Sequence, residues 1–532
     1  MWIIAADVLR DTFFANDAVE KTEQGLSIQI MDLKFTDKEL RNFLWESWSL
    51  GWPMILIMFF QFSIGLADVY VAGYMGTNVL AAVGYVGQLY WTLVILANGI
   101  TVGTVSMVSQ AYGAKSCEGV SNITANSLLI GIAVAGLLTV FSELYPDAIV
   151  RLAGMPPEIQ EIAENFIRIF SLVLLPTYVM IITGGVLRAS GRVRIAMINS
   201  FLASLINVVG DLVLGFGWGP IPALGYLGIA WATAIGTTLG MVLNLVYVFQ
   251  GAARITGRSL ISPISPCIMN LLKIGIPTVL QQTAWNVGTL VVYFLVGQIQ
   301  GGEITALAAM TAGIRIEAIV FLPIFALNMA SAVLTGSRIG AGDISGARSG
   351  AKASAVLCLL IILIPSAVIF LFAPVLSGWL TEDYSVLVEM TRYLRINMIG
   401  MPFLAVGICL AGALQGAGDT YASMRIIFTG MWFLRIPLIL FVIYYINSGA
   451  EGIWWAMAFS IIIMCGLFVK RFWGEEWTRA SVDRKKKTML WEACISRNPK
   501  PARQCLVEEE RVQMATRLKE IGTQTGHGPD SR

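Results

Sequence analysis

Two aspartates stand inside apolar stretches of this sequence, and each has an amide side chain on the same helical face. Asp211 lies in SLINVVGDLVLGFGW with Asn207 four positions before it, and Asp68 follows Gln61 by seven positions. Spacings of four and seven residues place side chains on one side of an α-helix. An ionised carboxylate is costly in hydrocarbon, so two carboxylates with two amides at one depth predict a site that binds a proton or Na⁺.

Simpler interpretations of the same residues stay open. Asp68 and Asp211 can each lie near the outer end of a helix, at the membrane interface, and GFGWGP follows Asp211 closely. Gln61 and Asn207 can be ordinary interhelical hydrogen-bonding groups. Pro53 lies in the same apolar stretch as Asp68, and in a helix it must bend the backbone or leave a carbonyl group unpaired.

The composition indicates that these residues belong to an integral membrane protein. Of the 532 residues, 56% are hydrophobic and 13% are charged, and the mean hydropathy is +0.72, whereas a soluble domain carries about 25% charged residues. A net charge of +2 gives no indication of a nucleic-acid partner. With one histidine, His527, and seven scattered cysteines, we expect reduced thiols, no metal or cofactor site and no enzymatic activity.

Roughly twelve apolar runs are long enough to cross about 30 Å of hydrocarbon. Every second loop is basic, and these loops contain Lys115, Arg188, Arg192, Arg194, Arg338, Arg348 and Arg425, among others. Basic loops face the cytosol, so we expect a multi-pass protein of the cell membrane with both termini inside. Asp211 then lies roughly 24 Å from the cytosolic start of its helix, at a depth similar to that of Asp68.

The two halves of the sequence resemble each other at an offset of roughly 225 residues. LGWPM (50–54) matches IGIPT (274–278), SQAYGAK (109–115) matches SRIGAGD (337–343), and GVLRASGR (185–192) matches GALQGAGD (412–419). The repeat predicts an all-α fold of two six-helix lobes related by pseudo-symmetry, with a substrate cleft between them. We expect an N-terminal arm (1–41), an N-lobe (42–250), a linker (251–272), a C-lobe (273–470) and a charged cytosolic tail (471–532).

The repeat is not symmetric in its acids. Leu438 aligns with Asp211, so the ion site is expected in the first half alone. Arg315, Glu317, Arg395 and Arg435 also fall in predicted spans, and we interpret most of them as structural or interfacial groups. Arg435 is the one expected to face a cavity in the second half.

The ordered set of motifs resembles the multidrug and toxic compound extrusion (MATE) transporters over roughly residues 42 to 470. The resemblance rests on GLADVYVAGYMGTNVLAAVG (65–84), LRASGRVRIAMIN (187–199), INVVGDLVL (206–214), LGIAWAT (227–233) and LQGAGDTYASM (414–424). It implies a V-shaped, two-lobed exporter of amphipathic organic cations, coupled to H⁺ or Na⁺. In prokaryotic members with an N-lobe site, the positions assigned to that site or to bending of the first helix match Pro53, Gln61, Asp68, Asn207, Asp211 and Thr233.

The resemblance also excludes one subgroup and leaves alternatives. That subgroup carries acids in the seventh and tenth spans, where this sequence reads QQTAWNVG (281–288) and MPFLAVG (401–407), so a C-lobe cation site is not expected. We expect a monomeric antiporter whose partners are small organic cations and the lipid bilayer. The main alternative is a flippase for lipid-linked sugars from the same wider superfamily, and a channel or an intramembrane enzyme is less consistent with the residues.

Overall fold

The computed structural model describes residues 37–220, 222–250, 265–299, 301–474 and 476–478. The regular elements of these residues are helices, and twelve of them are long and apolar enough to cross a membrane. The predicted all-α, multi-pass fold with twelve spans is therefore confirmed. The predicted arm (1–41), linker (251–272) and tail (471–532) lie largely outside the described residues, and their boundaries stay predictions.

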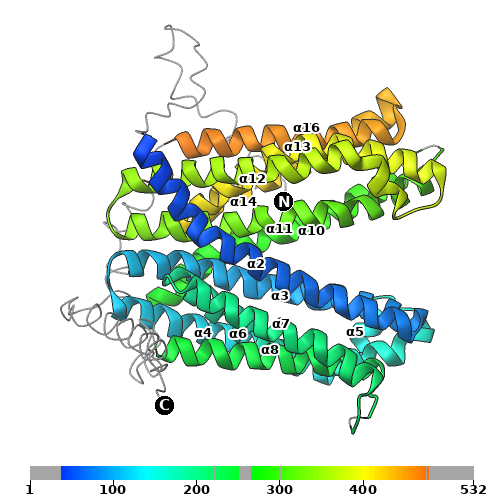
Figure 1. The fold of residues 1–532 in the computed structure, drawn as a ribbon, viewed down its shortest axis with the longest axis horizontal. Coiled ribbons are helices and arrows are strands. Elements are labelled where there is room, and N and C mark those ends of the chain that lie inside the picture. The colour runs from blue at the N-terminus through cyan, green and yellow to red at the C-terminus, as the bar shows by residue number, and fades with distance from the viewer. Residues whose placement is uncertain (1–36, 221, 251–264, 300, 475, 479–532) are drawn as a thin grey trace, which may run out of the picture.

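The twelve spans form two groups of six, which lie one above the other in Figure 1. The N-lobe contains α2 (Asp37–Met75), α3 (Thr77–Gly113), α4 (Cys117–Leu144), a short α5 (Pro146–Leu152), α6 (Pro157–Ala189), α7 (Val193–Phe216) and α8 (Tyr226–Phe249). The C-lobe contains α10 (Ser265–Val296), α11 (Glu303–Gly340), α12 (Ile344–Gly378), α13 (Tyr384–Gly416) and α16 (Gly449–Trp473). Its fifth span is divided into α14 (Thr420–Phe428), the π-helical η2 (Thr429–Arg435), α15 (Ile436–Phe441) and the π-helical η3 (Val442–Ile446).

The turns between the helices repeat from one lobe to the other. Gly191 (φ +79°), after α6, corresponds to Gly418 (φ +83°), after α13, and Lys115 (φ +56°), after α3, corresponds to Gly342 (φ +82°), after α11. These left-handed backbone conformations favour glycine, which is why the glycines of the repeated motifs are needed for the turns themselves. The internal repeat predicted from sequence therefore extends to backbone conformation.

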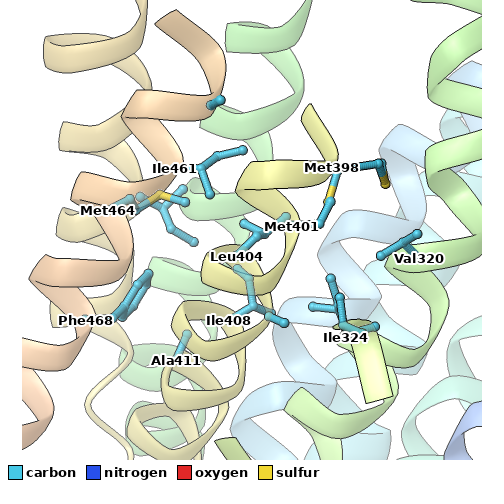
Figure 2. Packing of buried hydrophobic residues seen from close by; sticks show 14 of the residues in the cluster. Val320, Ile324, Met398, Met401, Leu404, Ile408, Ala411, Ile461, Met464 and Phe468 are labelled. Atoms are coloured by element: carbon cyan, nitrogen blue, oxygen red, sulfur yellow. The ribbon is translucent and has the colours of Figure 1, made fainter. Parts of the chain in front are cut away.

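The core of the C-lobe is built around α13. Figure 2 shows Met401, Leu404 and Ile408 of this helix packed against side chains from α16 on one side and α11 on the other. Because most of α13 is covered by its neighbours, every position from Met398 to Leu414 carries an apolar or small residue. Side chains on the adjoining helices are therefore held in fixed positions around it.

The cysteines differ in part from the sequence-based expectation. Cys267, Cys358, Cys409 and Cys465 are buried and form no disulfide bond, as expected for small core residues. Cys117 is disulfide-bonded, so the prediction of reduced thiols throughout is wrong at that residue.

The lobes join at one end of the molecule, which we call the basic end because the Lys115 and Arg338 loops lie there. Glu46 of α2 pairs with Arg338 of α11 at 2.6 Å, and the Ser47 hydroxyl lies 2.9 Å from that of Ser354 on α12. The Gln110 side chain of α3 donates to the Gly416 carbonyl oxygen at 2.8 Å. These polar contacts connect α2 and α3 directly to the C-lobe.

Two glycines allow the closest approach of backbones at the basic end. A Cβ atom on Gly113 would lie 2.7 Å from the carbonyl carbon of Ser337, and one on Gly340 would lie 2.7 Å from the carbonyl carbon of Gln110. The same offset along the chain separates Gly113 from Gly340 and Gln110 from Ser337, so the contact is reciprocal between the lobes. We call these four residues the glycine contact.

Candidate functional site

Helices α2, α7 and α8 pack closely enough to bring the predicted polar residues of the first half together. A Cβ atom on Gly228 of α8 would lie 2.5 Å from the Leu214 carbonyl carbon, and one on Gly236 would lie 3.0 Å from Asn207 Cβ. Without side chains at these glycines, α8 rests directly on α7. The Ser204 hydroxyl of α7 also donates to the Phe60 carbonyl oxygen of α2 at 2.9 Å.

Asp211 and Asn207 are enclosed, with 0% and 1% of their surface exposed. The Asn207 side-chain amide donates to the Thr233 hydroxyl at 3.0 Å, and that hydroxyl donates to the Ile229 carbonyl oxygen at 3.2 Å. Asp68 of α2 is half-buried, and its carboxyl group faces that of Asp211 directly. Four of the five site residues predicted from sequence, Asp68, Asp211, Asn207 and Thr233, thus lie together.

The remaining predicted residues lie apart from this group. Gln61 is exposed on α2 and has no hydrogen bond within the described part of the chain. Pro53 lies inside α2, which continues without interruption from Asp37 to Met75. In Figure 1 α2 changes direction along its length, as expected of a helix that lacks one backbone hydrogen bond.

Tyr90 of α3 completes the surroundings of Asp68 and was not singled out from the sequence. Its hydroxyl group is within electrostatic reach of Asp68 and is hydrogen-bonded to Thr177 of α6. The neighbouring Tyr178 donates to the Leu93 carbonyl oxygen at 2.7 Å. A signal was available in the sequence, because a tyrosine inside a membrane span needs a partner for its hydroxyl.

The site has an excess of acceptors. Four side-chain oxygens are enclosed here, namely Asp68 Oδ1, Asn207 Oδ1 and both carboxylate oxygens of Asp211. Among the described residues, no N–H or hydroxyl group donates a hydrogen bond to any of them. Buried acceptors without donors are costly. Such a group of oxygens can share a proton between two carboxyl groups or surround a monovalent cation, because either ligand supplies the missing positive charge.

The charged residues of the C-lobe spans fall into two kinds. Arg315 and Arg395 are exposed, whereas Glu317 and Arg435 are buried with 5% and 6% of their surface exposed. Glu317 on α11 lies beside Tyr393 of α13. The second half therefore contains a buried acid, Glu317, in the eighth span. The seventh and tenth spans, in which one subgroup of the family carries acids, have none at the corresponding positions.

The twelve spans of the described residues form two pseudo-symmetric lobes, and one lobe holds the facing carboxyl groups of Asp68 and Asp211. This arrangement defines a multi-pass membrane protein of the transporter class. A family model described as MatE matches residues 53–213 and 277–441, which is more than half of the chain. The chain belongs to the MatE family.

Curated relatives carry names that refer to drug resistance. The chain is 26% identical over 424 residues to a "Probable multidrug resistance protein NorM" of Thermotoga maritima, covering 79% of this chain and 90% of the relative. A protein of the same name from Acinetobacter baylyi is 24% identical over 435 residues. The match covers 80% of this chain and 94% of that relative.

Solved structures share the fold. One described as an "Outward-facing conformation of a multidrug resistance MATE family transporter of the MOP superfamily" gives a TM-score of 0.75 at 23% identity, covering 86% of this chain and 100% of that chain. A crystal structure of a mutant of the Vibrio cholerae MATE transporter VcmN gives a TM-score of 0.75 at 20% identity. The match covers 85% of this chain and 99% of that chain.

Proposed function

We propose that this chain is an efflux transporter that exports amphipathic organic cations in exchange for H⁺ or Na⁺. The observation that carries the proposal is the Asp68–Asp211 pair, whose enclosed oxygens lack donors. Membership of the MatE family and relatives named multidrug resistance proteins support the same function. A transporter of this kind needs no organic cofactor, performs no covalent chemistry and works as a monomer in the cell membrane.

The basic end faces the cytosol in this proposal, together with both chain termini, because basic loops stay on the cytosolic side. The contacts between the lobes, from Glu46–Arg338 to the glycine contact, close that end. The conformation is then the outward-facing one, in which exported substrate leaves and the coupling ion enters.

Exchange follows from the charge of the carboxylate pair. With the pair ionised, the N-lobe attracts a cationic substrate. A proton or Na⁺ bound at Asp68 and Asp211 removes that charge, weakens substrate binding on the outer side and lets α2 repack around Pro53. A ligand shifts such an equilibrium only by its differential affinity for the two conformations, so substrate and coupling ion must compete for the same negative charge.

The test is efflux of a fluorescent organic cation from proteoliposomes under imposed pH or Na⁺ gradients. Asp211→Asn should abolish gradient-driven transport, and the gradient that drives the wild type identifies the coupling ion. The matched control is Asp383→Asn, an exposed aspartate that accepts a hydrogen bond from the Ser385 N–H at 2.8 Å at the start of α13, because asparagine also caps helices.

Two outcomes would contradict the proposal. Unchanged transport in a well-folded Asp211→Asn protein would return this carboxyl group to a structural role. Absence of cation transport in the wild type would favour a flippase for lipid-linked sugars instead.

A further inference from the structure

A groove lies beside α11 at the end of the molecule opposite the basic end. Its volume is about 540 Å³, and it lies between one face of the first half of α11 and Leu380, which follows α12. Ile304, Ala308, Thr311 and Arg315 of α11 line it, and their spacing of three or four positions is that of a single helix face. The lining is apolar apart from one hydroxyl group and one guanidinium group.

Arg315 supplies the charge of this groove and forms no ion pair with any described residue. Its side chain is exposed, and the ion pairs of the described residues involve other arginines. Glu317 stands two positions later, and a turn of about 100° per residue directs it to the opposite side of the helix, where it is buried beside Tyr393. Asp383, near Leu380 in sequence, accepts from the Ser385 N–H at 2.8 Å. The charge of Arg315 is therefore open to an external anion.

The depth of Arg315 is that of a membrane interface. With 38 residues, α11 is about 57 Å long and, when centred, extends roughly 13 Å beyond each side of a hydrocarbon layer about 30 Å thick. Arg315 follows Glu303, the first residue of α11, by 12 positions, or about 18 Å. Helical side chains lean toward the N-terminus of their helix, so the guanidinium group extends back into the groove, toward the layer of lipid phosphates.

The same face of α11 stays apolar on the membrane side of Arg315. Ile319 and Leu322 follow it by four and seven positions and are exposed and half-buried. An acyl chain can lie along these two residues while its phosphate reaches Arg315. The apolar walls of the groove strengthen such a charge pair, because attraction between charges rises as the dielectric constant falls. A water-soluble anion would gain the charge pair but not the contact along α11.

We propose that Arg315 and the groove beside it bind one anionic phospholipid, with the lipid phosphate on the guanidinium group and an acyl chain along α11. A guanidinium group binds phosphate through two parallel hydrogen bonds. A zwitterionic lipid carries its own cation near the phosphate, which offsets the attraction of Arg315, so the site selects anionic headgroups. The inference goes beyond the proposed export function and does not depend on it, because the lipid is a bound component of the protein and not an exported substrate.

The test uses two probes with the same acyl chains, dioleoyl phosphatidylglycerol and dioleoyl phosphatidylcholine. Binding of the first lipid molecule to the purified full chain is measured by native mass spectrometry. Arg315→Gln should weaken phosphatidylglycerol binding by about tenfold or more, the effect of losing a hydrogen bond to a charged group. It should change phosphatidylcholine binding by less than about twofold. Arg315→Lys should retain most of the affinity, because lysine also binds phosphate as a point charge.

Arg395 of α13 provides the matched control. It is exposed as well and follows Tyr384, the first residue of its helix, by 11 positions. Its guanidinium carbon, however, lies 6.0 Å from the centre of the Phe370 ring, and its Nε atom donates to the Phe370 carbonyl oxygen at 3.4 Å. Because this arginine already has partners, Arg395→Gln should leave the affinity for phosphatidylglycerol unchanged.

Thr311→Glu gives a second measurement that keeps the arginine. Thr311 is exposed and precedes Arg315 by four positions, so a glutamate there pairs with the guanidinium group across one turn of the helix. This variant should lower phosphatidylglycerol binding about as much as Arg315→Gln does, and it decides the question if Arg315→Gln does not fold.

Three outcomes would overturn the proposed lipid site. Equal losses for both lipids, or no loss in either variant, would make Arg315 an ordinary interfacial arginine. Displacement of phosphatidylglycerol by an equal concentration of glycerol phosphate would assign the groove to a soluble anion. Failure of the wild type to export organic cations would overturn the proposed function alone, because lipid binding is measured without transport.

Discussion

Replacing Gly113 by alanine should open the basic end of the molecule. The added Cβ atom would lie 2.7 Å from the carbonyl carbon and 2.9 Å from the Cα atom of Ser337, whereas carbon atoms in contact stand at about 3.5–4.0 Å. Backbone atoms cannot rotate away as a flexible side chain can, so α3 and α11 must separate. Overpacking of this kind costs about 1–3 kcal/mol, which lowers the ratio of closed to open molecules by about 5- to 150-fold.

The separation can be measured by double electron–electron resonance in a cysteine-free background. Spin labels at Ala114 and Ala341, the exposed residues that directly follow α3 and α11, report the distance across the basic end. Gly113→Ala should add a population at longer distance. Gly340→Ala should do the same, because its Cβ atom would meet the Gln110 carbonyl group in the reciprocal position.

Gly136→Ala is the matched control for this experiment. Gly136 lies inside α4, and a Cβ atom added there would have no neighbouring atom within 4 Å, so the substitution gives the same gain in helix propensity, about 1 kcal/mol, without a clash. Its distance distribution should equal that of the wild type. If Gly113→Ala also matched the wild type, the glycine contact would not hold the basic end closed, and the reasoning from backbone proximity would be refuted.

Three further perturbations test other contacts. Thr233→Val should destabilise the folded protein by about 1–3 kcal/mol in thermal denaturation, because the enclosed Asn207 amide loses its acceptor, whereas Thr233→Ser should not. Glu46→Gln should change the free-energy difference between closed and open molecules by only about 0.2–1 kcal/mol, and by less at high salt. The reason is that the side chains of the Glu46–Arg338 pair are each about one-third exposed. A large effect that persists at high salt would contradict this weak role. The pKa of Asp343 is held below its ordinary value of 3.8, chiefly by the Gly346 N–H group. A lowered folded pKa means that the stabilisation is fully present above the ordinary value and is lost only as pH falls through the lowered one. The distance between the spin labels at Ala114 and Ala341 should therefore stay constant from about pH 5 to 8. A change of that distance within this range would contradict the lowered pKa of Asp343.

The sequence predicts the depth of a residue well but not its direction around the helix. The positions of Asp68 and Asp211 along their helices placed both at one depth, and the structure brings them face to face. Gln61, chosen by the same rule of spacing, is exposed. A rise of 1.5 Å per residue fixes height, but which neighbour a side chain meets depends on how the helices pack.

The C-lobe illustrates the same limit. Glu317 and Tyr393 are far apart in sequence and become neighbours only because α11 packs against α13. The sequence identifies Glu317 and Arg435 as residues of predicted spans, but spacing along one helix cannot bring them together with Tyr393, because the three residues lie on α11, η2 and α13. The repeat, in contrast, was readable because the turns need left-handed residues at fixed positions, such as Gly191 and Gly418.

The glycine contact has the form of an interface between two identical subunits. In a two-fold dimer, residue i of one copy meets residue j of the other, and residue j meets residue i in return. Gly113 with Ser337 and Gly340 with Gln110 follow this rule inside a single chain. The basic end thus has the geometry of a two-fold interface between half-length units of one chain. This symmetry stops at the polar groups of the spans, because one lobe carries the carboxylate pair and the other a buried guanidinium group.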